Sequence, residues 1–194
     1  MANRGDGSGA NSDTTGKKRI SCSIIALVLV AGGICVVPVL GVVAAVAIPA
    51  FINFTKRSKT SEAGPNLRMM YEGAATYYMA EHVSRDGSVL RHCTVDPATT
   101  PATPTNGRVS LSGRWPESFV AIDMTPPDPL YFQYAIVGAP SRCGVGPDEA
   151  VYTFQAHGDL DADGVLSTFE YSVESNSSNE LYRSVGLYVV NELE

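Results

Sequence analysis

The longest uncharged stretch of the sequence, residues 20–55, most limits what this chain can fold into. It holds 36 residues without a single Asp, Glu, Lys or Arg. A bilayer core about 30 Å thick needs roughly 20 apolar helical residues, so the stretch is longer than one crossing requires and too short for two. We therefore expect one transmembrane helix over residues 20–55, with a globular domain following it.

The flanks of this stretch bear on its topology. Residues 1–19 are rich in Gly, Asn, Ser and Asp without apolar periodicity, which predicts a disordered tail. The basic cluster at residues 17–19 favours a cytoplasmic N-terminus, whereas the cluster at residues 56–59 favours the opposite orientation. We expect a single-pass protein with a cytoplasmic tail. A cleaved signal peptide is the alternative, but about 25 apolar residues precede the small residues at 45–47, against the 7–15 typical of a signal peptide.

Charge is divided unevenly along the chain. Residues 1–59 carry a balance of +5 and residues 60–194 a balance of −11. An acidic outer domain argues against nucleic acid as a partner, because nucleic acid requires a basic face. Cys93 and Cys143 both lie in this domain, and two cysteines in an acidic exported domain indicate one disulfide; two separate thiols are the alternative.

Beyond residue 55, apolar residues recur at spacings of three and four. This pattern predicts an amphipathic continuation of the helix over residues 56–82, with a break near Gly64-Pro65. The apolar stripe consists of Leu67, Met70, Tyr71, Ala74, Tyr77 and Tyr78. Residues 83–194 are expected to form the head, beginning with a loop-like region to about residue 129 in which residues 97–104 form an extended Pro/Thr surface loop.

Four short segments rich in aromatic and β-branched residues follow, each bounded by turn residues. They span residues 130–137, 150–156, 168–173 and 185–190. Their close spacing predicts an antiparallel meander. A helical spine followed by a run of strands gives an α+β fold, in which the long membrane-spanning helix packs by its outer half on a small antiparallel sheet.

The segment Gly41–Phe51, together with residues 56–63 and 66–68, resembles the N-terminal helix of bacterial type IV pilins and type II secretion pseudopilins. The resemblance implies a pilin-like fold and a helix that first anchors the subunit in the bacterial inner membrane. That helix then packs with other pilin-like subunits into the core of a fibre. The head is implied to be periplasmic, or displayed at the cell surface in a pilus.

Two features of that family are missing here. Family members are cut after a glycine, before an aromatic residue or methionine, and a glutamate that helps docking follows. When Pro49 is aligned with the family's helix proline, Leu27 and Val28 occupy the cleavage junction and Gly32 stands in place of the glutamate. The rival hypothesis is therefore a stand-alone, membrane-anchored periplasmic calcium-binding module that does not enter a fibre.

Residues 159–170 predict calcium binding, because they match the twelve-residue EF-hand loop. The predicted ligands all offer oxygen: Asp159, Asp161, Asp163, the carbonyl of Val165, Ser167 through a water, and Glu170 with both oxygens. Gly164 permits the sharp turn, and Leu166 is expected to tie the loop to the core. Four carboxylates repel one another without a cation, and hard oxygen ligands select Ca²⁺. An acidic surface turn without metal is the alternative.

The segments that flank this loop are strand-like rather than helical, which favours structural calcium over signalling, with a Kd of roughly 10⁻⁴ to 10⁻³ M. Catalytic signals are few. The three histidines lack metal spacing, and there is no nucleophile elbow, phosphate loop or dinucleotide fingerprint. We therefore predict no enzyme activity and no small-molecule substrate, and we expect His157 to be a strand residue.

Overall fold

The computed structural model describes residues 22–104, 107–126 and 129–193, and the side chains from Val37 onward. The predicted tail, residues 1–19, lies outside the described residues. The chain divides into two compact units, one ending at Ile48 and one beginning at Pro49. We call the second unit the head, and every contact given below lies within it.

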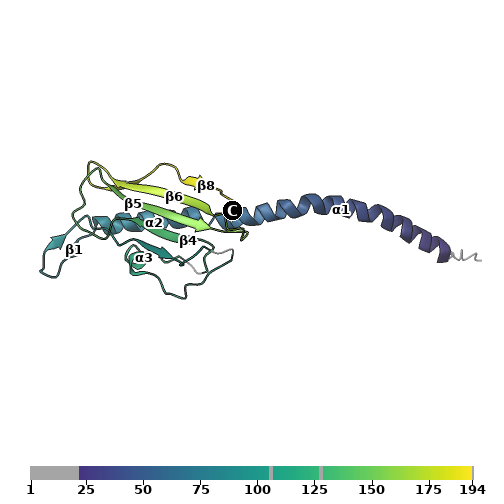
Figure 1. Ribbon diagram of the computed structural model, residues 1–194, viewed down its shortest axis with the longest axis horizontal. Helices are drawn as coiled ribbons and strands as arrows, with labels where there is room; N and C mark the ends of the chain where they lie inside the picture. The colour runs from purple at the N-terminus through teal and green to yellow at the C-terminus, as the bar shows by residue number, and fades with distance from the viewer. Residues whose placement is uncertain (1–21, 105–106, 127–128, 194) are drawn as a thin grey trace, which may run out of the picture. The chain divides into compact units, whose positions relative to one another are not determined.

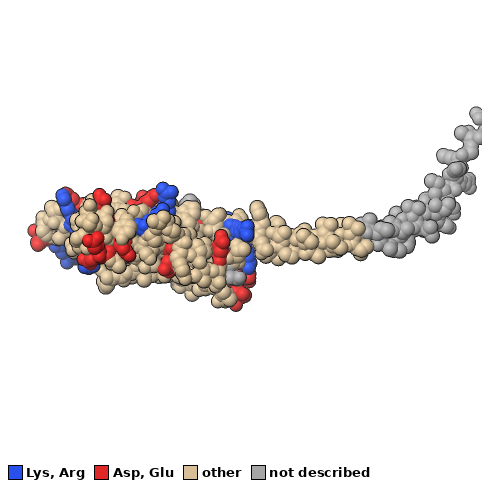
Figure 2. Space-filling view, turned by 90° about the horizontal axis from the view of Figure 1, so that it is seen from above, with Lys and Arg blue, Asp and Glu red and all other residues tan. Residues whose placement is uncertain are grey.

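Helix α1 runs over 39 residues, Cys22–Thr60. Among the described residues, one helix is long and apolar enough to cross a membrane. Its most apolar stretch of 18 residues lies at or beyond Val37, has a mean hydropathy of 2.2 and contains no buried residue. This helix is consistent with single-pass anchoring, and its described part before Lys56 shows no charged side chain in Figure 2.

Helix α2, Ala63–Met79, begins after a two-residue turn at Ser61 and Glu62. The break therefore comes two residues before the predicted position at Gly64-Pro65. Pro65 is accommodated because it stands in the first turn of α2, where its missing N–H has no helical acceptor. The Glu62 carboxylate joins this turn to the sheet, since its oxygens accept hydrogen bonds from the Tyr131 N–H at 3.1 and 3.2 Å and from the Tyr134 hydroxyl at 3.0 Å.

The main sheet is antiparallel throughout, with strands in the order β3-β4-β5-β6-β7 and β8 also paired with β6. Figure 1 shows α2 behind strands β4–β6. The strands are β3 (Ala98–Thr100), β4 (Gln133–Gly138), β5 (Ala150–Gly158), β6 (Ser167–Ser175), β7 (Leu181–Arg183) and β8 (Tyr188–Val190). This confirms an α+β architecture with one long apolar helix and an antiparallel sheet.

The core lies between α2 and one face of this sheet. Alternate residues of the strands point inward, so that Phe154 and Phe169 are buried against a helix face that includes Leu67, Met70 and Tyr78. The predicted apolar stripe of α2 is therefore largely its buried face. Phe132 and Phe169 meet edge to face with ring centroids 5.6 Å apart, an arrangement that aromatic pairs prefer.

The region expected to be loop-like contains regular elements. They are a hairpin of β1 (His82–Val83) and β2 (Val89–Leu90), the edge strand β3, and the short helix α3 (Glu117–Ala121). Helix α2 ends at Met79, so His82, predicted as the last residue of the helix, belongs to β1 instead. The prediction of an extended surface loop over residues 97–104 was wrong for Ala98–Thr100, which pair with β4. An edge strand tolerates prolines at its ends because one side of its backbone needs no strand partner.

A disulfide joins Cys93 to Cys143 across 50 residues of sequence. The backbone on both sides of the bridge is also paired: the Thr94 N–H donates to the Arg142 carbonyl at 2.7 Å, and the Gly144 N–H donates to the Arg91 carbonyl at 2.9 Å. The predicted disulfide therefore joins two loops whose backbones are also hydrogen-bonded to each other.

Candidate metal centre

The connection between β5 and β6 carries three aspartates that converge. Strand pairing ends at Gly158 opposite Ser167, which leaves residues 159–166 as the loop of a hairpin. One carboxylate oxygen from each of Asp159, Asp161 and Asp163 lies within 4.8 Å of the others. We call these three residues the aspartate cluster. Two oxygens on opposite sides of one Ca²⁺ are about 5 Å apart, so the spacing suits a shared cation.

The conformation of the loop explains the convergence. Gly164 has a φ of +88° and Ala162 a φ of +64°, both in the left-handed region that reverses the chain tightly. The Asp163 Oδ1 accepts a hydrogen bond from the Val165 N–H at 2.7 Å, which closes the turn. The predicted turn at Gly164 is therefore present.

Asp159 shows the strongest sign of a missing partner. Its Oδ1 atom is buried and accepts no hydrogen bond. A buried carboxylate oxygen without a donor is costly, because it has lost its water and gained nothing in return. A cation bound between the three carboxylates would satisfy this oxygen, so the residues present fit a hard divalent ion.

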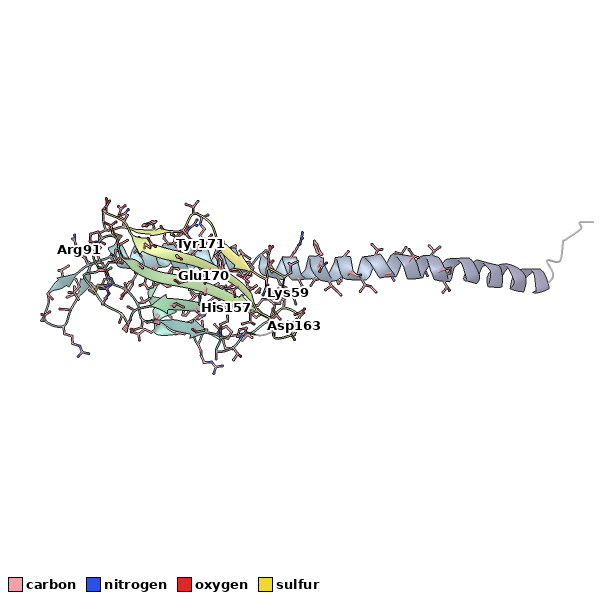
Figure 3. All side chains as sticks on the ribbon, turned by 45° about the horizontal axis from the view of Figure 1, so that its top comes forward. Lys59, Arg91, His157, Asp163, Glu170 and Tyr171 are labelled. Atoms are coloured by element: carbon pink, nitrogen blue, oxygen red, sulfur yellow. A yellow bond between two sulfur atoms is a disulfide. The ribbon has the colours of Figure 1, made fainter. Side chains whose placement is uncertain are left out.

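The protein also supplies its own cations to this loop. The Lys56 Nζ lies 2.8 Å from the Asp161 Oδ2, and the Lys59 Nζ donates to the Leu160 carbonyl at 3.4 Å. The ion pair with Lys56 holds the pKa of Asp161 below its usual value. Lys59 and Asp163 lie at the same end of the head in Figure 3, and Figure 2 shows acidic and basic side chains adjacent there.

Glu170, the predicted twelfth-position ligand, does not join the aspartate cluster. It is the fourth residue of β6 and lies opposite Gln155, whose Nε2 donates to the Glu170 Oε2 at 2.9 Å. A strand advances about 3.3 Å per residue, against 1.5 Å in a helix, so the three steps from Ser167 carry Glu170 about 10 Å along the sheet. Figure 3 shows Glu170 well along the sheet from Asp163.

Of the two remaining predicted ligands, Ser167 is engaged elsewhere and Val165 is not. Ser167 is buried in β6, and its Oγ donates to the Gly158 carbonyl at 3.1 Å across the hairpin. Val165 stays in the loop, where its N–H is bonded to Asp163. The structure therefore groups three of the six predicted ligands and places Ser167 and Glu170 in the sheet.

The anchoring residue of the loop differs from the prediction. Leu166 is 37% exposed, whereas Leu160 is 5% exposed and belongs to the core. The expectation for Leu166 was therefore wrong. The EF-hand pattern places its apolar contact at the eighth position, whereas here the buried residue is Leu160, at the second position of the loop.

His157 lies in β5 on the outer face of the sheet, as expected of a strand residue. Its Nδ1 is 3.1 Å from the Thr168 Oγ1, and its Nε2 is 3.4 Å from the Gln155 Oε1. Burial lowers its pKa, while Glu170 acts in the opposite direction. Both ring nitrogens of His157 therefore have a polar partner within the sheet.

Sequence reasoning missed Lys56 and Lys59 as partners of the loop. They lie about a hundred residues before it, and the available signal was their spacing of three, which puts both on one face of a helix beside an acidic loop of opposite charge. No family model, curated protein or solved structure matches the chain.

Proposed function

We propose that this protein is a membrane-anchored structural subunit of the type IV pilin or type II secretion pseudopilin kind, with a head stabilised by calcium. One observation carries the proposal: a single long apolar helix leads, after a two-residue turn, into a helix that forms the core of an antiparallel head. In a chain built in this way, the anchor is followed directly by the head in the sequence.

The described part of α1 before Lys56 supports association between helices. Every side chain from Val37 to Phe54 is exposed in the isolated chain. Small residues at Gly41, Ala44 and Ala47 recur at spacings of three, which puts them on one face and lets another helix approach closely. A Cβ built on Gly41 meets nothing within 4 Å, so this face is open to a partner.

The segment Gly41–Phe51 and the residues that follow it also carry the resemblance to the pilin helix. A structural subunit needs no catalytic group. The partners proposed are the inner membrane and other pilin-like subunits, bound through α1. Residues 60–194 carry a balance of −11, which does not favour nucleic acid as a partner, and the proposal assigns no small-molecule substrate.

Calcium is proposed to bind the aspartate cluster and to act structurally. Asp159, Asp161 and Asp163 would hold the ion, which would supply the positive charge that three neighbouring carboxylates require. The buried Asp159 Oδ1 without a hydrogen bond supports this assignment. Because Lys56 already pairs with Asp161, calcium must compete with an internal cation, which agrees with binding in the range of roughly 10⁻⁴ to 10⁻³ M.

The test is the location and N-terminus of the mature protein in its native cells. Membranes and surface material released by shearing are separated, and the chain in each is identified by mass spectrometry. A chain present in sheared fibres supports an assembling subunit. An intact chain confined to the membrane supports the second candidate, an anchored calcium-binding module, which the missing cleavage junction and glutamate favour.

A further inference from the structure

The last residues of the apolar run, which lie at the start of the head, are unusually apolar for a segment in water. Phe51, Ile52 and Phe54 are 69%, 50% and 71% exposed. Directly after them come Lys56, Arg57 and Lys59, which we call the basic end of α1. Large exposed apolar side chains followed by lysine and arginine are typical of a helix that leaves a membrane, because the basic groups reach the lipid headgroups.

The length of the uncharged run is compatible with this boundary. At about 1.5 Å per residue, the helical part of the run, residues 22–55, is about 51 Å long, while a bilayer with its headgroups is about 40–45 Å thick. A helix that is too long for its bilayer tilts, and a tilt of roughly 35° removes the difference. The basic end of α1 then lies in a headgroup layer.

The β5–β6 loop, residues 159–166, is fastened to the basic end of α1. Lys56 binds Asp161, and Lys59 binds the carbonyl of Leu160. The two segments also share a hollow lined by Phe51, Ile52, Lys56, Lys59, Leu160 and Asp161. The loop therefore lies at the same depth as Lys56 relative to any membrane that surrounds the end of the apolar run.

The loop itself exposes apolar side chains at its C-terminal end. Val165 is 44% exposed and Leu166 is 37% exposed. The Asn191 Nδ2 lies 3.5 Å from the Leu166 carbonyl, which brings the end of β8 to the same place, and Val190 there is 37% exposed. Connecting loops in water are normally polar, so this apolar group is better suited to contact with lipid.

Charge does not oppose such a contact. The aspartate cluster contributes three negative charges and the basic end of α1 contributes three positive charges. The two groups are joined by the Lys56–Asp161 ion pair, so their charges balance. No metal is needed to bring the loop to a zwitterionic membrane.

We propose that the β5–β6 loop is a membrane-contact site, which lies among the lipid headgroups beside α1 with Val165 and Leu166 turned toward the acyl chains. This site fixes the head against the bilayer surface. The proposal requires only that α1 spans a membrane. It depends neither on fibre assembly nor on calcium.

The experiment places a nitroxide on Val165 and measures its collisions with oxygen, which concentrates in lipid, and with a water-soluble nickel chelate. The full chain carries Val165→Cys in a background with Cys22→Ser and Cys35→Ser, and it is reconstituted in phosphatidylcholine vesicles with EDTA. Val83→Cys is the matched control, because Val83 is 74% exposed in β1, at the end of the head opposite the loop. Leu166→Cys serves as a second probe.

The expected result is a several-fold higher ratio of oxygen to nickel collisions at Val165 and Leu166 than at Val83. Equal ratios at the three positions would overturn the proposal, because the loop would then lie in water. Low collision rates with both reagents at Val165 would also overturn it, because the loop would then be covered by protein. The labels sit on exposed side chains, so the fold is expected to tolerate them.

Discussion

Replacing Asp159 by Asn distinguishes calcium binding from an acidic surface turn without metal. In the presence of calcium, the two hypotheses predict changes in Tm of opposite sign. Without calcium, the substitution removes one of three carboxylates whose oxygens lie within 4.8 Å of one another, and it replaces a partly buried charged group by a neutral amide, which costs less to bury. We therefore expect the Asp159→Asn chain to melt at the same temperature as the parent, or higher, in EDTA.

With calcium, the order reverses. At about 10 mM Ca²⁺ and a Kd of roughly 10⁻⁴ to 10⁻³ M, the parent gains about 1.4–2.7 kcal/mol. At about 2–4 °C per kcal/mol, this raises its Tm by roughly 3–10 °C. Tenfold weaker binding by the Asn variant leaves a gain of about 0.4–1.4 kcal/mol, so its Tm in calcium falls below that of the parent.

The assay is thermal melting of the full chain in detergent micelles, followed by the fluorescence of its single tryptophan, Trp115. The matched control is Glu170→Gln, which removes the same charge from the same hairpin. Because Glu170 is bonded to Gln155 and lies away from the aspartate cluster, this variant should keep the calcium response. An equal calcium response in the parent and the Asn variant would refute the site, and loss of the response in Glu170→Gln would refute the assigned ligand set.

Three further predictions concern the head. Burial raises the pKa of Glu62 above its usual value, so the fold favours the protonated form of this side chain. The stability that Glu62 contributes is therefore present below its unfolded pKa and is lost as pH rises through its folded pKa. A Glu62→Gln chain should show a flatter dependence of Tm on pH above about 4.5, and an unchanged slope would contradict this. Replacing both Cys93 and Cys143 by Ser should cost about 4 kcal/mol in urea unfolding for a separation of 50 residues, and a midpoint equal to that of the parent would argue against a stabilising bridge. A Cβ on Gly73 would clash with the Ile122 carbonyl oxygen, whereas a Cβ on Gly64 meets nothing within 4 Å. Gly73→Ala should therefore lower the Tm, and Gly64→Ala should raise it slightly. Similar effects of the two substitutions would show that α2 and α3 do not approach this closely.

The parts of the fold that could be predicted from sequence are those with a strong pattern. The apolar run, the stripe on α2 and the strands β4–β6 all combine periodicity with enough length to bury several large side chains. Strands β3 and β7 are three residues long and carry Thr or Arg. Their place in the sheet depends on pairing with neighbours, which no local pattern expresses.

The candidate site was predictable in residue type but not in geometry. The sequence indicates an acidic loop with a tight turn at Gly164, and both are present. It does not reveal that Glu170 is carried away by the rise of a strand, or that Leu160 rather than Leu166 is buried. Lys56 enters the site from about a hundred residues away, and only the packing of the hairpin on the end of α1 makes it a partner.

The central claim is that α1 joins copies of this protein in the membrane through its small-residue face. The most direct measurement is cross-linking in native cells of a chain with Ala44→Cys, compared with Val42→Cys on the opposite face of the same helix, both in a background with Cys22→Ser and Cys35→Ser. We predict oxidised dimers for Ala44→Cys and far fewer for Val42→Cys. Monomers alone for both variants, or equal amounts of dimer, would contradict the claim.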